Sequence, residues 1–352
     1  MSPTLEAARR APSSAPSSSQ TGSQTGAPTG GHGWRRAAAS DHAATILASR
    51  DERAGELGRD LAAALPDPAT FAEQLGAAFR ELADPAYRDG QAFVAPGIGP
   101  TYGVRTPLQV AVRKGFERAS RQASTSELLL VADRLLRVPE REVRWFAITT
   151  LQRTLRKEPE RTWQLLRRAA ADADDWITVD TLAHPFGAGI LAESYRWAEL
   201  EQLTVSVSRW ERRLVGSTIA TLPSVDRRAG REPEVATRSL AILATLIGDS
   251  EREVQKALSW AYRSMALVDL AATTAALERE AGLAAETDDG HRAWVIRDSA
   301  SKLAPDDAAR LKALLAGIRR RSGAPSTSAA AELAQRFAGM HLGRRMPEPP
   351  LT

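Results

Sequence analysis

The sequence predicts an all-α fold, an α-α superhelix of paired helices with disordered tails. Three observations predict it. Apolar residues recur at helical spacing through most of residues 107–320, short breakers separate stretches of about 12 to 20 residues, and no alternating strand or hairpin signal interrupts them. About 12 helices in roughly 280 residues have the rhythm of HEAT-like repeats of about 40 to 47 residues each.

The N-terminal part of the chain is expected to have two sections. Residues 11–31 are Ser, Thr, Gly, Pro, Gln and Ala without charge, so residues 1–40 are predicted to be a disordered low-complexity tail. Residues 41–100 are predicted to hold two helices, broken at Pro66 and Pro68, and a loop. The loop is expected over residues 89–106 because proline and glycine are too dense there for a helix.

Residues 101–320 are predicted to form the repeat domain. Its clearest helices are expected at residues 126–137, 140–157, 160–171, 234–247, 250–265 and 306–319. Pro139, Pro159, Pro233 and Pro305 are expected in first turns, where the fixed φ of proline favours a helix. Residues 321–352 are predicted to be a flexible linker and a short amphipathic helix, with Leu333, Phe337 and Met340 on one stripe that docks on the repeats or binds a partner.

Composition excludes several kinds of chemistry. The 352 residues include no cysteine, which excludes disulfides, thiolate metal sites and a catalytic thiol. No apolar run is long enough to span a membrane, and the N-terminus lacks the hydrophobic stretch of a secretory signal. The sequence therefore predicts a cytoplasmic protein. Its five histidines are scattered and form no H-x-x-x-H pair, so metal catalysis is not expected.

The distribution of charge matters more than the net charge of +4. Residues 137–168 hold nine basic and four acidic residues, and residues 205–231 hold six basic and two acidic residues. Between them, residues 169–180 hold four Asp and no base. This pattern suits a carboxylate presented to a DNA duplex that is held by its phosphates, but it is equally expected if half of the arginines are solvated or paired with neighbours such as Glu158 and Glu160.

Three tryptophan motifs recur on successive predicted helices. Trp176 and Asp180 are four residues apart in DDWITVD, Trp210 lies in SRWERR, and Lys256 and Trp260 are four residues apart in VQKALSWAYR. Residues at this spacing share one helix face. Each tryptophan either belongs to a binding surface or fills a gap between helices.

In this order, the motifs resemble those of the DNA alkylation repair family, the HEAT-like-repeat DNA glycosylases of the AlkD kind. YGVRTP at residues 102–107 and EVRWFAITTL at residues 142–151 are similar to the loop that precedes the family's repeats and to an early helix. WVIRDSASKL from Trp294 is similar to the closing helix. The resemblance covers about residues 100 to 320.

The resemblance implies roles for particular residues. Asp180 matches the catalytic aspartate, Trp176 and Trp260 match tryptophans that pack against the DNA backbone at the lesion, and Arg213 matches an arginine that holds a phosphate. Trp210 is the aromatic residue beside Arg213 and is expected to pack inside, whereas Arg212, Lys256 and Arg263 are expected to hold phosphates.

Two departures from the family pattern lie close to Asp180. Asp175 and Ile177 stand where many members have an asparagine and an aspartate, and Pro185 predicts an early end to the helix that carries Asp180.

The implied chemistry is hydrolysis of the N-glycosidic bond of N3- or N7-alkylated purines in duplex DNA by a monomeric, nucleoid-associated enzyme that needs no cofactor. A cationic base leaves as a neutral molecule and needs no general acid, so one carboxylate is enough to stabilise the oxocarbenium-like sugar and to orient water. Only five lysines occur and none suits a Schiff base at the site, which predicts a monofunctional glycosylase. The alternatives are a DNA-binding protein that recognises distorted or branched DNA without catalysis, and a protein scaffold.

Two other groups of polar residues have plainer explanations. Asp172, Asp174 and Asp175 are expected at a helix N-terminus, since the spacing lacks the later ligands of a calcium loop. His184 is expected to cap a loop before Pro185, although its position four residues after Asp180 also brings it within reach of the site.

Overall fold

The computed structural model describes residues 31–94 and 97–338. Its α-helices are α1 (Gly31–Asp60), α2 (Pro68–Leu82), α3 (Pro85–Val94), α4 (Thr106–Ala119), α5 (Thr125–Leu136), α6 (Arg141–Thr154), α7 (Pro159–Ala171), α8 (Trp176–Ala192), α9 (Arg196–Gln202), α10 (Arg209–Val225), α11 (Pro233–Leu246), α12 (Arg252–Ala266), α13 (Leu270–Thr287), α14 (Gly290–Ser299), α15 (Pro305–Leu314) and α16 (Ala329–Ala338). Short 3-10 turns follow α1, α9, α10 and α14. The described residues contain no strand, so the predicted all-α class is confirmed.

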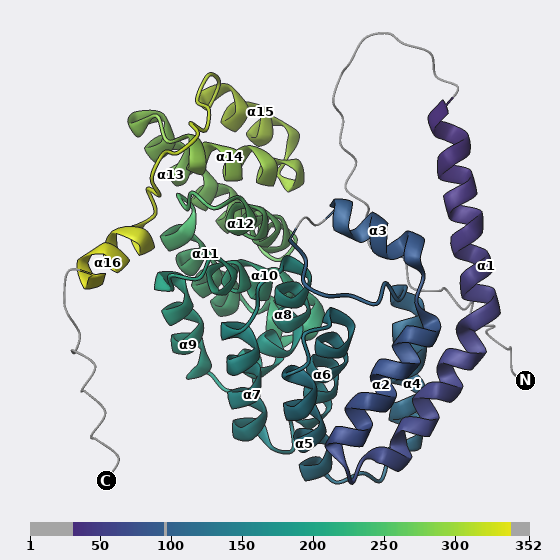
Figure 1. The fold of residues 1–352 in the computed structure, drawn as a ribbon. Helices are drawn as coiled ribbons and strands as arrows, with labels where there is room; N and C mark the ends of the chain where they lie inside the picture. Colours follow the sequence, from purple (N-terminus) through teal and green to yellow (C-terminus); the bar gives the residue numbers. More distant parts are fainter. Residues whose placement is uncertain (1–30, 95–96, 339–352) are drawn as a thin grey trace, which may run out of the picture. The chain divides into compact units, whose positions relative to one another are not determined.

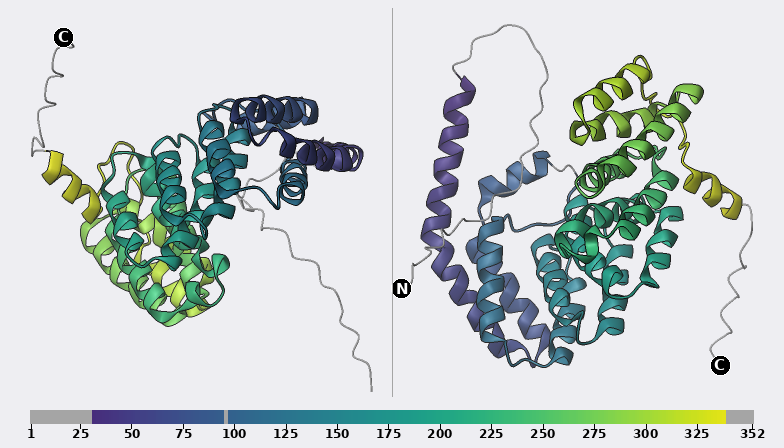
Figure 2. Two further views of the ribbon diagram at one scale, coloured as in Figure 1. Left: turned by 90° about the horizontal axis from the view of Figure 1, so that it is seen from below. Right: turned by 180° about the vertical axis from the view of Figure 1, so that it is seen from behind.

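The chain divides into two units, residues 1–48 and 49–352. In the first unit the described residues all belong to α1. In the second unit the later helices form two layers (Figures 1 and 2): α6, α8, α10, α12 and α14 lie side by side, and α5, α7, α11, α13 and α15 pack on them. This alternation is that of helical repeats, as the sequence predicts.

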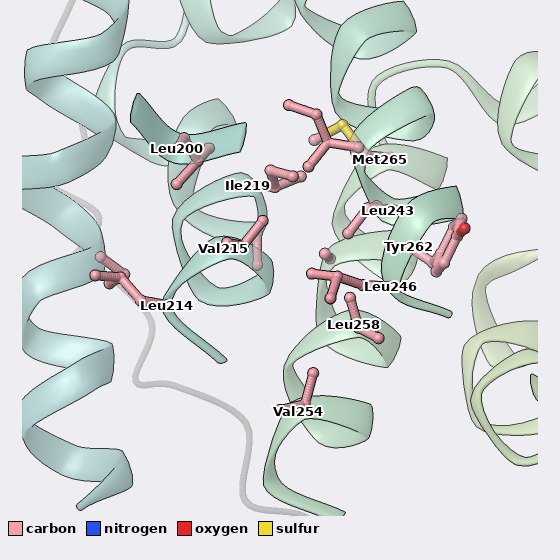
Figure 3. Close-up of a cluster of buried hydrophobic side chains, with 14 of the residues drawn as sticks. Leu200, Leu214, Val215, Ile219, Leu243, Leu246, Val254, Leu258, Tyr262 and Met265 are labelled. Atoms are coloured by element: carbon pink, nitrogen blue, oxygen red, sulfur yellow. The ribbon is translucent and has the colours of Figure 1, made fainter. Parts of the chain in front are cut away.

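The core of the second unit lies between these two layers. Figure 3 shows the part around α10, where Val215 and Ile219 point between α11 and α12. Both side chains are fully buried, as are Leu258 and Tyr262 of α12. Residues four apart share a helix face, so each helix offers a continuous apolar stripe, and each buried aliphatic side chain contributes roughly 1.5 to 3 kcal/mol.

Several boundaries differ from the sequence prediction. α1 begins at Gly31 and so includes the last ten residues of the predicted disordered tail, and the rest of that tail lies outside the described residues. α3 occupies part of the predicted loop because Pro85 starts a helix that Asp84 caps with its side chain. Pro159, Pro233 and Pro305 lie in first turns as predicted, whereas Pro139 precedes the residue that caps α6.

Pro185 does not end α8, which continues to Ala192, so the prediction of an early break was wrong. Proline removes one backbone hydrogen bond from a helix interior. Phe186 and Ile190 are almost fully buried beyond it, and their burial offsets that loss. α10 contains Pro223 in the same way.

The segment predicted as a flexible linker is held in place. The backbone N–H of Thr327 donates to the carbonyl of Gly248 at 2.9 Å, and its hydroxyl donates to Asp289. α16 packs against α11 and the turn after α9, in agreement with the docking alternative. Of the predicted apolar stripe only the Leu333 side chain is described, and Met340 lies outside the described residues.

None of the helices in the described ranges is both long and apolar enough to cross a bilayer.

Candidate functional site

Three neighbouring helices, α8, α10 and α12, carry the motif residues. Asp175 caps α8: its carboxylate accepts from the backbone N–H groups of Ile177 and Thr178 at 2.8 and 2.9 Å. The helix-N-terminus prediction for this aspartate is confirmed. Trp176 is then the first residue of α8, and Asp180 follows one turn later on the same face, as expected from the spacing.

The Asp180 carboxylate is fixed by two residues of α10. Arg213 donates from Nε to Oδ1 at 3.2 Å and from Nη2 to Oδ2 at 2.9 Å, and Ser217 donates its hydroxyl to Oδ1 at 2.7 Å. Arg213 and Ser217 are one turn apart, so both reach the same carboxylate. A carboxylate has about four acceptor positions, and three are used. The remaining capacity is on Oδ2, and the Asp180 side chain is 24% exposed, which leaves room for a water molecule or a sugar.

Arg213 links all three helices. Its Nη1 donates to the backbone carbonyl of Glu253 at 2.8 Å and to the Glu253 carboxylate at 3.2 Å. Lys256 donates to the other oxygen of Glu253 at 2.7 Å. The four charges Asp180, Arg213, Glu253 and Lys256 therefore balance, and Arg213 is buried while the carboxylates on either side of it are partly open.

Trp176 stands beside this chain of charges. The Arg213 guanidinium carbon lies 5.9 Å from the centre of the indole ring, within cation-π range. Trp176 also lines a cavity of about 460 Å³ with Trp210, Arg209, Lys256 and the loop residue Ile98. The cavity thus opens at the N-terminal ends of α8, α10 and α12, one turn from Asp180.

The loop of YGVRTP is held against α6 by a buried carboxylate. Glu142 accepts from the Thr101 hydroxyl at 2.6 Å and from the backbone N–H groups of Tyr102, Gly103 and Val104 at 2.9 to 3.1 Å. Gly103 has φ +80°, and a Cβ there would lie 2.5 Å from the Cβ of Arg88, so only glycine fits. On the same helix, Arg144 pairs with Asp174 at 3.2 Å, which ties α6 to the turn before α8.

Two arginines expected to hold phosphates are engaged within the protein. Arg212 donates to buried Asp249 at 2.6 Å and to the carbonyl of Ser206 at 2.8 Å. Arg263 pairs with Asp298 and with the hydroxyl of Ser259. These contacts favour a role in joining α10 to the end of α11, and α12 to α14, because guanidinium donors already in use are poor ligands for an incoming phosphate.

The tryptophans differ in their surroundings. Trp210 and Trp260 are partly buried and pack against the hydrophobic core, which agrees with the gap-filling alternative for these two. Arg209 stacks on Trp210, with its guanidinium carbon 4.9 Å from the ring centre. Trp176 is partly buried as well, but it is not among the residues packed on that core, and its ring lies near the Arg213 guanidinium that binds Asp180.

His184 lies inside α8, so the expectation that it caps a loop was wrong; the helix continues through Pro185. Its Nδ1 is 2.8 Å from the side-chain amide nitrogen of Gln152 on α6. Burial lowers the pKa of His184, which favours the neutral ring at pH 7.

Sequence reasoning missed Ser217, Glu253 and Glu142. Ser217 could have been predicted from the sequence, because a residue four positions after Arg213 shares its helix face. Glu253 and Glu142 depend on which helices become neighbours, and only the folded chain shows that.

Comparison with known proteins gives the family of this chain. The family model for the DNA alkylation repair enzyme matches residues 75–303. A solved structure described as a predicted DNA alkylation repair enzyme from Enterococcus faecalis is similar over 56% of this chain and 89% of that chain, with 15% sequence identity and a TM-score of 0.46. No curated protein matches. Because the family model matches well over half of the chain, this protein belongs to the DNA alkylation repair enzyme family.

Proposed function

We propose that this protein is a monofunctional DNA glycosylase that hydrolyses the N-glycosidic bond of N3- or N7-alkylated purines in double-stranded DNA. The observation that carries the proposal is the setting of Asp180. Its carboxylate is held by three hydrogen bonds, is partly exposed, keeps acceptor capacity on Oδ2 and lies one turn from an aromatic ring beside a cavity.

The chemistry requires little more than this carboxylate. Alkylation at N3 or N7 gives the base a positive charge, so the C1′–N bond breaks with the electron pair going to the base, which leaves neutral. The sugar becomes oxocarbenium-like, and a fixed negative charge near C1′ stabilises it in the transition state. Water held by Oδ2 of Asp180 then attacks C1′ and gives up a proton to solvent through the carboxylate.

The other residues act around this step. Arg213 and Ser217 position Asp180, and Trp176 contacts the cationic nucleotide through its ring face, a contact of roughly 0.5 to 2 kcal/mol. Among the cations of the three motifs, Lys256 is the best candidate for binding a phosphate, because its side chain is half-exposed and its contact with Glu253 uses only one of the three donors of the ammonium group. Arg212, Arg263, Trp210 and Trp260 support the helices that carry these residues. The protein acts as a monomer, in the cytoplasm at the nucleoid, without a cofactor and without lyase activity.

The test is release of the free base. A duplex with a single N7-methylguanine is incubated with excess protein, and free N7-methylguanine is separated by chromatography. We expect base release that leaves an intact strand with an abasic site, cleaved only after alkali. Strand cleavage without alkali would contradict the monofunctional mechanism, and the absence of free base would contradict the glycosylase.

One observation favours a second function, a non-catalytic reader of distorted or branched DNA. The Asp180 carboxylate is already paired with Arg213 and joins α8 to α10, a role that needs no chemistry. Such a protein would bind DNA with strong salt dependence and release no base. A protein scaffold, the third class, would show neither property.

A further inference from the structure

The two basic segments of the sequence separate into paired and unpaired residues in the fold. Most of their arginines are engaged: Arg153 with Ser120, Arg167 with Glu199 and Arg168 with Asp133 are examples. Glu160, expected to neutralise its neighbours, is bound instead by Arg196 and Tyr195. Most of the basic residues in these segments are thus paired within the protein, as one of the two sequence alternatives expects. The few that remain unpaired are the candidates for binding an anion.

Four unpaired cations gather at two neighbouring turns. Arg156 and Lys157 follow α6, and Arg227 and Arg228 follow α10; we call these four residues the basic rim. Each is exposed, and within the described part of the chain none of their side chains makes a hydrogen bond or an ion pair. About 70 residues of sequence separate the two pairs. In the two basic segments, residues 137–168 and 205–231, Arg161 on α7 is the one other basic residue whose exposed side chain makes neither contact.

The basic rim lies beside a cavity of about 520 Å³ at the C-terminal ends of α6, α8 and α10. Of the four rim residues Arg156 lines the cavity, and Asp226 and Ala229, which flank Arg227 and Arg228, line it from the turn after α10. Part of its lining is apolar, with Leu155, Leu191 and Val225. Deoxyribose has an apolar face and phosphate is an anion, so the lining is complementary to a stretch of sugar-phosphate backbone.

Three carboxylates lie near the rim. Asp226 and Glu193 line the cavity, and Glu158 follows Lys157 in the chain. Hydrogen bonds from the backbone N–H groups of Arg228 and Ala229 to one Asp226 oxygen, at 2.8 and 2.9 Å, lower the pKa of Asp226, and the nearby charges of Arg156 and Arg228 lower it further. Asp226 therefore attracts these two cations without a hydrogen bond or a close ion pair to either of them. The rim guanidinium groups keep their donors for a bidentate anion, which phosphate provides.

The position of the cavity relative to Asp180 fits a duplex. His184 lines the cavity and lies one turn after Asp180 on α8, a rise of about 6 Å, and Ala188 lies two turns after it, about 12 Å. A groove of B-DNA is about 6 or about 12 Å wide. A duplex with its damaged nucleotide at Asp180 and its groove crossing α8 would therefore bring further phosphates to the cavity beside the basic rim.

From this placement we infer that the basic rim is a second DNA contact, which binds backbone phosphates away from the damaged nucleotide, on the side of Asp180 opposite to Trp176. The inference rests on the proposed binding of duplex DNA but not on base release. It explains why cations remain unpaired at this end of the helices, whereas at the other end Arg209, Lys256 and Arg144 are paired with acids.

Favourable interaction of cations with helix C-termini is the competing explanation, and a matched comparison separates the two. The rim variant carries Arg156→Gln, Lys157→Gln, Arg227→Gln and Arg228→Gln. The control variant carries Arg118→Gln, Arg121→Gln, Lys302→Gln and Lys312→Gln, which remove the same charge from exposed side chains elsewhere. Binding of an undamaged 20-base-pair duplex is followed by fluorescence anisotropy from low to physiological salt, after thermal melting has confirmed that both variants fold.

Removing the cation that binds one phosphate lowers the slope of log K against log salt by about 0.9. We expect the slope of the rim variant to fall by about two to four and its affinity to fall at least about tenfold, whereas the control should keep the wild-type slope. Equal slopes for both variants, or an equal decrease in both, would overturn the inference. Base release by the wild-type protein is measured separately, so a glycosylase that fails and a rim that fails give different results.

Discussion

Asp180 and Arg213 should be energetically coupled, and a double-mutant cycle measures that coupling. Arg213 has 7% of its side chain exposed and makes a two-point contact with Asp180, whose side chain is 24% exposed. Arg213→Met leaves two partly buried carboxylates, Asp180 and Glu253, without the cation between them, and should cost about 3 kcal/mol. Asp180→Asn leaves Arg213 with Glu253 and should cost about 1.5 kcal/mol.

Each single variant already loses the ion pair between Asp180 and Arg213, so its loss contributes only once in the double variant, and the two costs should not add. We expect about 2.5 kcal/mol for the double variant where independent sites would give about 4.5, a coupling energy of about 2 kcal/mol. Urea unfolding followed by circular dichroism measures all four proteins. Arg213→Met combined with Asp298→Asn, which removes the partner of Arg263 on another helix, is the control and should be additive to within about 0.5 kcal/mol. A coupling below that value between positions 180 and 213 would refute the ion pair at the centre of the site.

Three further predictions concern single positions. The buried hydroxyl of Thr218 has no hydrogen-bond partner in the described part of the chain. Thr218→Val should therefore stabilise the protein by about 1 kcal/mol in urea unfolding and leave base release unchanged. A decrease in stability would mean that the hydroxyl has a partner. Trp176→Ala should reduce base release at least tenfold with a small change in melting temperature. Trp260→Ala should lower the free energy of unfolding by about 3 kcal/mol, because Trp260 packs on the core. A large loss of stability in Trp176→Ala with a stable Trp260→Ala would contradict these placements. Burial lowers the pKa of His184 in the folded state, so the unfolded chain takes up the proton first, and the free energy of unfolding should fall as the pH drops below the ordinary value of about 6.5. His184→Asn should flatten that decline between about pH 7 and pH 5. An unchanged profile would show that another group titrates.

Much of the fold follows from local sequence. Helices such as α5, α7 and α11 begin within a residue or two of their predicted positions, because capping residues and first-turn prolines define their starts. The errors arise where tertiary packing overrides a local signal. Pro185 is a local signal for the end of a helix, but α8 continues through it, and Phe186 and Ile190 beyond it are buried.

In the candidate site too, local spacing predicts some features and tertiary packing determines the others. Trp176 and Asp180 could be placed on one helix face by spacing alone, and so could Arg213 and Ser217. That these two faces meet, and that Arg213 uses its donors on Asp180 and Glu253, depends on the packing of α8, α10 and α12. Residue type likewise did not show that Arg212 and Arg263 are held internally, since a paired and an unpaired arginine have the same letter in the sequence.

The most direct test of the central claim is the single-turnover rate of base release from a duplex with one N7-methylguanine, measured for the wild type and for Asp180→Asn together with the affinity of each for the same DNA. The catalytic-carboxylate account predicts that the variant binds DNA within about threefold of the wild type and releases the base at least about a hundredfold more slowly, which corresponds to a decrease of about 2.7 kcal/mol in transition-state stabilisation. Equal rates for the two proteins would contradict it.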